Sequence, residues 1–162
     1  MTAVLGLLGS RDPLTVMRET PDALRKAIAG VPESRLRQPE APGKWSVAHV
    51  LQHLADSEIV GGWRFRLVLA QDRPALTGYD QDAWAARLHY DMADPTQALE
   101  EFAVIRRGNL RLLERATPEE LARVGVHSER GEESLGHLRK LYAGHDVLHR
   151  RQIDRILAAV AR

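Results

Sequence analysis

The chain contains no cysteine among its 162 residues. Disulfide bonds, thiolate metal ligands and a nucleophilic thiol of the protein itself are therefore excluded. Any thiol chemistry at this protein would need a thiol that arrives with a cosubstrate.

The sequence also lacks a large net charge and any long hydrophobic run. Its 23 Lys and Arg residues are balanced by 22 Asp and Glu residues, so we expect neither nucleic acid nor an anionic membrane as a partner. No stretch approaches the roughly 20 apolar residues of a membrane span. The short apolar run at 4–9 lacks the basic start of a signal peptide. These absences favour a cytoplasmic protein.

Strand signals are nearly absent, whereas apolar residues recur at helical spacing along the chain. Residues suited to capping a helix N-terminus precede four such stretches: Asp12, Ser46, Asp94 and Ser134. Proline follows two of these caps at the first helical position. Helices are predicted near 13–30, 46–70, 95–116 and 134–160, within a single domain over 1–162. Pro21 allows the first helical region to be either two short helices or one bent helix.

The connection over 71–93 is several times longer than the 2–8 residues that link antiparallel neighbours in a bundle. It is long enough to return along the bundle, so that helices two and three run parallel. The pattern therefore predicts an all-α fold, a four-helix bundle with up-down-down-up topology and a long connection between helices 2 and 3. Short helical turns are predicted at 82–88 and after Thr117.

Three histidines are the most informative residues. His145 and His149 are four apart, so their side chains stack on one face of the last helix. His53 lies on the second helix, and packed helices are roughly 8–10 Å apart, so it can reach the pair. Three neutral imidazoles leave a position open for water or substrate, as in catalytic zinc sites. The alternative is three histidines satisfied by ordinary hydrogen bonds.

Five motifs occur along the chain in a recognisable order. They are Pro-Gly-Lys-Trp-Ser-Val at 42–47, His-Leu-Ala-Asp-Ser-Glu at 53–58, Asp-Gln-Asp-Ala-Trp at 80–84, Gly-Val-His-Ser-Glu-Arg-Gly at 125–131 and His-x-x-x-His-x-x-Gln-Ile at 145–153. With these motifs, the segment from about 12 to 156 resembles the DinB-like superfamily of metal-binding four-helix bundles. The superfamily includes bacillithiol transferases, with mycothiol-dependent maleylpyruvate isomerases as distant relatives.

The resemblance implies that His53, His145 and His149 are the metal ligands. It also implies a homodimer, for which Trp63 and Arg64 are a candidate surface patch. Zinc is the expected ion, with nickel, iron and manganese as alternatives, because three imidazoles do not select one metal. His49 and His137 are the nearest competing histidines, and neither they nor His89 and His127 are expected to bind the metal.

Three residues are candidates for supporting the chemistry: Tyr142 and Gln152 on the histidine-bearing face, and Asp56 as an outer partner of His53. Glu58 is more simply interpreted as a buried acid paired with an arginine such as Arg64 or Arg66, and Asp146 as a solvated residue. Trp45, Tyr79 and Trp84 are further candidates for lining a pocket.

Two enzymatic interpretations follow for a small-molecule substrate. The metal activates water for hydrolysis, or it activates a low-molecular-weight thiol for transfer, which the resemblance slightly favours. The alternative class is a metal-stabilised dimeric binding protein without turnover. An open coordination position in a pocket would favour an enzyme over a closed structural site.

Overall fold

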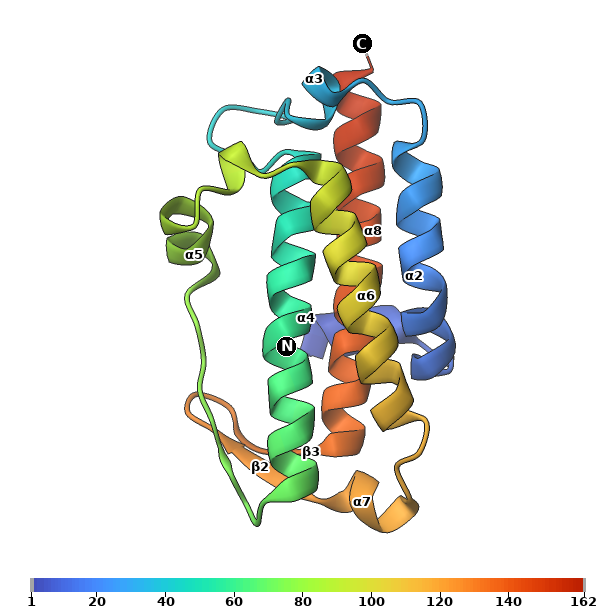
Figure 1. The fold of residues 1–162 in the computed structure, drawn as a ribbon, viewed down its shortest axis with the longest axis vertical. Coiled ribbons are helices and arrows are strands. Elements are labelled where there is room, and N and C mark those ends of the chain that lie inside the picture. The colour runs from blue at the N-terminus through green and yellow to red at the C-terminus, as the bar shows by residue number, and fades with distance from the viewer. Residues whose placement is uncertain (1, 162) are drawn as a thin grey trace.

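The computed structural model describes residues 2–161, and four long helices dominate it (Figure 1). They are α2 (Pro13–Ile28), α4 (Val47–Ala70), α6 (Pro95–Leu113) and α8 (Leu135–Val160). The predicted caps are present, because the side chains of Asp12, Ser46, Asp94 and Ser134 each accept a backbone N–H of the first turn. Pro21 lies inside α2, so the first helical region is one helix.

The helices follow the predicted up-down-down-up order. In Figure 1, α2 and α8 run toward the end that carries the C-terminus, and α4 and α6 run the opposite way. The connection between α4 and α6 returns along the bundle and contains α5 (Gln81–Arg87) and a 3-10 turn, η1 (Tyr90–Met92). Two other short helices, α3 (Glu33–Leu36) and α7 (Pro118–Ala122), lie at opposite ends of the bundle. A capping box of Thr117 and Glu120 begins α7, as its sequence predicts.

A small sheet was not expected from the sequence. It contains β1 (Ala75–Leu76), β2 (Val124–His127) and β3 (Gly131–Ser134), in the order β1-β2-β3. β2 pairs in parallel with β1 and antiparallel with β3. Gly125 permits this packing, because a Cβ there would lie 2.8 Å from the Leu76 side chain. The sheet fixes the long connection at the end of the bundle where α8 begins.

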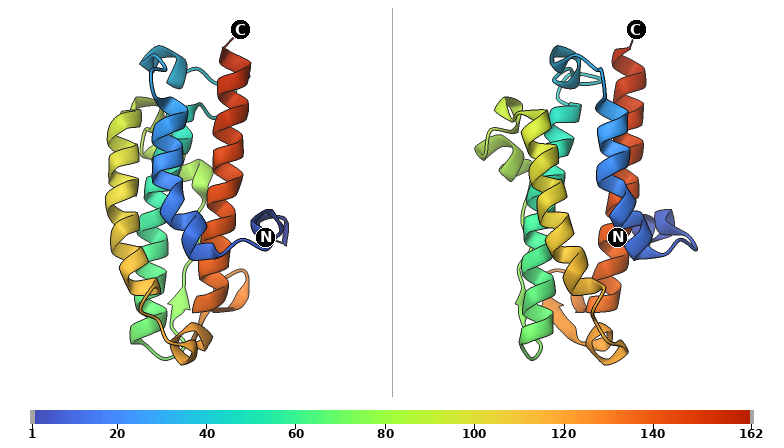
Figure 2. Two further views of the ribbon diagram at one scale, coloured as in Figure 1. Left: turned by 90° about the vertical axis from the view of Figure 1, so that its right-hand side faces the viewer. Right: turned by 45° about the vertical axis from the view of Figure 1, so that its right-hand side comes forward.

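The N-terminal helix α1 (Thr2–Leu8) was also missed by the sequence analysis. It stands out from the side of the bundle beside α8 (Figure 2). Its backbone packs directly on Gly144, where a Cβ would lie 2.3 Å from the Val4 carbonyl oxygen. The apolar N-terminal run therefore covers α8 next to His145. Within residues 2–161, no helix combines the length and apolar character that crossing a membrane requires.

The core consists of two apolar clusters stacked along the bundle. One includes Phe65, Leu113 and Leu138 near the sheet, and the other includes Leu51, Phe102 and Ile153 nearer the opposite end. Buried polar residues lie between the two clusters in sequence, Asp56 to Glu58 on α4 and Arg106 on α6, and His53 directly precedes Leu54 of the second cluster. This polar layer contains the histidines.

Candidate metal centre

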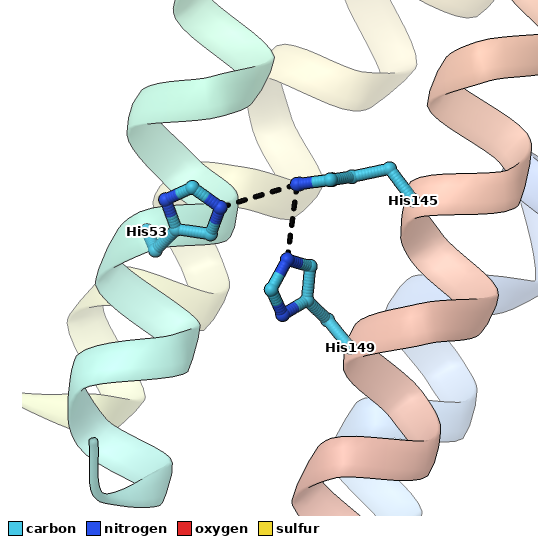
Figure 3. A group of neighbouring side chains, drawn as sticks. All are labelled: His53, His145 and His149. Carbon is cyan, nitrogen blue, oxygen red and sulfur yellow. Dashed lines mark hydrogen bonds between the residues drawn. The ribbon is translucent and has the colours of Figure 1, made fainter. Parts of the chain in front are cut away.

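The three predicted histidines converge, His53 from α4 and His145 and His149 from α8 (Figure 3). The Nε2 atom of His145 lies 3.1 Å from that of His53 and 3.0 Å from that of His149. Nitrogen ligands at 2.0–2.1 Å from a tetrahedral zinc ion would lie about 3.3 Å apart. The two short distances are close to this value, and all three ligand nitrogens lie within 4.8 Å of one another, which suits one bound cation.

All three histidines are held in their neutral form. Burial is the main cause, and the nearby His149 a secondary one, that lowers the pKa of His53 to about 3. Burial also lowers the pKa of His149 to about 4 and that of His145 well below its usual value. A metal binds the neutral imidazole, so none of these ligands has to lose a proton at neutral pH.

Gln152 fixes the orientation of His149. Its side-chain oxygen lies 2.8 Å from the Nδ1 of His149, and it accepts the hydrogen when Nδ1 is protonated. The lone pair of His149 then points from Nε2 toward His145. Since the Nε2 of His145 carries at most one hydrogen in the neutral ring, it can donate to only one of its two neighbouring nitrogens. The other close contact between ring nitrogens is then left without a hydrogen bond, whereas a shared cation would accept a lone pair from each of the three rings.

Asp56 does not support His53 as expected. Its carboxylate accepts hydrogen bonds from the Tyr90 hydroxyl and the Gln52 side chain, at 2.5 and 3.3 Å. The Nδ1 of His53 is buried and has no hydrogen-bond partner in the described structure. The Trp45 ring packs against the His53 ring instead, with 5.1 Å between their centroids.

The expectation that Glu58 is a buried acid paired with an arginine is confirmed, although the partner is Arg106 rather than Arg64 or Arg66. The expectation that Asp146 is solvated was wrong, because its side chain is buried. The Arg106 guanidinium donates to Asp146 at 2.5 and 2.9 Å and to Glu58 at 2.8 Å. This ion-paired cluster packs next to the histidines, because Asp146 directly follows His145.

The remaining histidines do not join the cluster. His49 lies in the first turn of α4, with its Nδ1 2.8 Å from the Ser46 hydroxyl. The Nε2 of His137 lies 3.8 Å from Glu133, and that of His127 is 3.3 Å from Arg64. His89 is exposed beside η1.

A cavity of about 350 Å³ reaches His53 and His145. Tyr142 lines it, with its ring centroid 6.4 Å from that of His145, and Gly61 makes room for the tyrosine ring. A Cβ at Gly61 would lie 2.5 Å from that ring. Burial raises the pKa of Tyr142, so its hydroxyl keeps its proton at neutral pH.

A second cavity, of about 680 Å³, lies against His145 and His149. It shares Val4, Gln81 and His145 with the first cavity. Trp45 lines the second cavity and Tyr79 the first, while Trp84 packs on Tyr79 with 4.5 Å between ring centroids. The histidine cluster is therefore reached from two sides.

The suggested surface patch is only half present. Trp63 is 62% exposed, whereas Arg64 is 6% exposed and faces the interior. The homodimer stays a prediction.

Comparison with known proteins points to one family. A sequence model of the DinB superfamily matches residues 17–153. The solved structure of YfiT from Bacillus subtilis, described as "a probable metal-dependent hydrolase with an unusual four-helix bundle topology", matches with a TM-score of 0.80 at 28% identity. The match covers 88% of this chain and 84% of YfiT.

Sequence relatives carry similar names. A protein of Geobacillus thermodenitrificans, named as a candidate metal-dependent hydrolase, is 39% identical over 44% of this chain and 40% of its own length. YfiT is 36% identical over 53% of this chain and 48% of its own length. These two matches span less than half of each relative. A similarly named protein of Bacillus licheniformis is 29% identical over 82% of this chain and 76% of its own.

Proposed function

Because the chain belongs to the DinB superfamily, we propose that it is a metal-dependent hydrolase of small molecules, with His53, His145 and His149 as its metal ligands. One observation carries this proposal: three neutral imidazoles converge where a cavity opens from the bundle. A structural zinc site normally has four protein ligands, whereas a catalytic site keeps a position open. The names of the relatives support the same class of reaction.

A divalent ion held in this way supplies a Lewis acid that polarises a carbonyl and activates water at neutral pH. The residues of the chain orient the histidines and contact the substrate. Gln152 orients His149, and the ion-paired cluster around Arg106 packs behind His145. The Tyr142 hydroxyl remains protonated in the cavity and can donate a hydrogen bond to a substrate oxygen. Zinc is the expected ion, with nickel, iron and manganese as alternatives.

The proposal is tested with untagged protein, since a histidine tag and nickel resin would confuse the metal content. Elemental analysis identifies the metal, and a panel of small esters and amides then tests turnover. We expect turnover that is lost on chelation, restored by the identified metal and absent in His145→Ala. His137→Ala is the matched control, because His137 lies on the same helix without joining the cluster. Absence of turnover across the panel, or turnover that survives chelation, would contradict the proposal.

Thiol transfer is the second candidate, and the paired cavities favour it. Two cavities that meet at His145 can hold two substrates side by side at one metal. Without a cysteine in the chain, the thiol must come from a cosubstrate. A conjugation screen with several small thiols and one electrophile separates this reaction from hydrolysis, since only transfer consumes the thiol.

A metal-stabilised dimeric binding protein is the non-catalytic alternative. The open approach to His53 and His145 argues against it, because a site kept only for stability has no need of a cavity. Stoichiometric metal together with no turnover in either screen would favour this alternative.

A further inference from the structure

Arg64 lies in the same cavity as the histidine cluster but belongs to a different part of it. It follows His53 by 11 residues on α4, about 16 Å along the helix and nearly on the same face. Ser57 and Gly61 occupy this face between them. Ser57 lines the cavity, and the Tyr142 ring packs on Gly61. His53 and Arg64 both line the cavity, and they lie at opposite ends of this stretch of the α4 face.

The Arg64 guanidinium has no anionic partner. It donates to the Thr77 carbonyl at 2.6 Å and lies 3.3 Å from the His127 Nε2 and 3.5 Å from the Tyr142 hydroxyl. Its Nε–H has no acceptor. Within residues 2–161 no carboxylate oxygen lies within 4.0 Å of it.

Arg106, the other buried arginine of this region, has the carboxylate partners that Arg64 lacks. Both arginines are buried, at 6% and 1% exposure, but Arg106 contacts two carboxylates and Arg64 contacts none. A buried charge without a counterion is costly, so such residues are normally paired. The cavity is the remaining direction from which an anion can approach Arg64.

A second arginine of the cavity, Arg130, already has an anionic partner. Arg130 also lines the cavity, but its Nε and Nη2 donate to the two oxygens of Glu133, at 2.6 and 2.8 Å. Its charge is therefore already matched. The positive charge of Arg64 is the one left over at this end of the cavity.

We propose that Arg64 binds the carboxylate of an anionic substrate whose ester or amide group faces the histidine cluster. Guanidinium and carboxylate match in shape and can form two parallel hydrogen bonds, which makes arginine well suited to this role. The apolar lining from Val4 and Leu141 accommodates a short hydrocarbon part between the two ends. The inference rests on the proposed function and adds its substrate class, a small carboxylic acid derivative.

The test measures binding rather than turnover, in zinc-loaded full-length protein. Butyrate is the probe, butyramide is its uncharged counterpart, and inorganic phosphate is a second anion. Binding is followed by NMR through the arginine Nε–H signals, with that of Arg64 assigned by its loss in Arg64→Gln. We expect butyrate to shift the Arg64 signal saturably, and butyramide to leave it unchanged.

Arg64→Gln should weaken butyrate binding at least about tenfold. Arg123→Gln is the matched control, because Arg123 likewise donates to backbone carbonyls, those of Val68 and Gln71, and lies at another cavity. That variant should bind butyrate as the unaltered protein does. Arg64→Lys keeps the positive charge and removes the same Nε–H signal, so it supplies the assignment if Arg64→Gln does not fold.

Three outcomes would overturn the proposal. If Arg64→Gln binds butyrate as tightly as the unaltered protein, the anion binds at the metal rather than at Arg64. If phosphate binds and butyrate does not, the site selects a different anion. If neither anion binds saturably, the cavity has no anion site. The hydrolase screen on the same preparation is read separately. Butyrate binding without turnover would refute only the hydrolase function. Turnover without butyrate binding would refute only the carboxylate site at Arg64.

Discussion

The Nδ1 of His149 lies 2.8 Å from the side-chain oxygen of Gln152, one turn further along α8. This contact sets which nitrogen of His149 carries the hydrogen and leaves the Nε2 lone pair directed at the other two histidines. Sequence spacing placed Gln152 on the same face, and the structure gives it this specific partner.

Gln152→Ala should therefore lower zinc affinity by about 10- to 100-fold, the usual effect of removing an outer partner of a histidine ligand. Gln52→Ala is the control, because Gln52 donates to Asp56 and contacts no histidine of the cluster through a hydrogen bond. Competition with a zinc-binding dye measures the zinc affinities of both variants. Equal affinities of the two variants would show that the Gln152 contact does not tune the site.

Removal of one of the three proposed metal ligands should have a larger effect than removal of Gln152. His53→Ala, His145→Ala and His149→Ala should each lose the stoichiometric metal and lower the melting temperature of the metal-loaded protein, since binding stabilises only the folded state. His137→Ala and His49→Ala should retain the metal. Elemental analysis of untagged variants checks this, and metal retained by His149→Ala would show that the triad is wrong.

The main helices could be predicted because their signals are local. Caps such as Ser46 and Asp94 and the apolar spacing within each helix depend on residues a few positions apart. The sheet depends instead on pairing between β1 and β2, which lie about 50 residues apart. β1 has only two residues, and the four-residue strands β2 and β3 each contain a glycine. Strands this short carry no usable alternating pattern, so the sequence could not reveal them.

The site was predictable only in part, for a similar reason. The spacing of His145 and His149 is local, whereas the partner of a buried charge depends on the helix that faces it. Asp146 and Glu58 both meet Arg106 from α6, which helical periodicity alone did not indicate. The sequence offered Arg64 both as a partner of Glu58 and as part of a surface patch with Trp63, whereas it is buried on the His53 face.

Pro21 explains another contact of Arg106. Proline has no amide hydrogen to donate to the Met17 carbonyl one turn earlier, and the Arg106 Nη1 donates to that oxygen at 2.9 Å. Arg106 therefore connects α2, α4 and α8 through one guanidinium.

Arg106→Met should destabilise the protein by about 3–5 kcal/mol, because it leaves Glu58 and Asp146 buried without a cation. Arg18→Met is the control, since the exposed Arg18–Glu114 pair should contribute at most about 1 kcal/mol. Adding Glu58→Gln and Asp146→Asn to Arg106→Met should recover part of the loss. Urea unfolding measures these changes, and similar effects of the two single variants would contradict the role given to Arg106.

The neutral histidines also predict how stability depends on pH. The pKa values of His53 and His149 are lowered mainly by burial, to about 3 and about 4, whereas in the unfolded chain they return to about 6.5. Below pH 6.5 the unfolded chain therefore binds more protons than the folded one. Stability of the metal-free protein is unaffected by these groups above that pH and falls as the pH decreases toward 3.

Between pH 7.5 and 5.0, each of these two histidines should cost the metal-free protein up to about 2 kcal/mol of unfolding free energy. The double variant His53→Asn and His149→Asn removes both groups, so it should lose less stability over the same interval. Comparing the two proteins subtracts the contribution of carboxylates, which they share. Urea unfolding at the two pH values gives the difference, and an equal loss in both proteins would mean that the fold does not hold these histidines neutral.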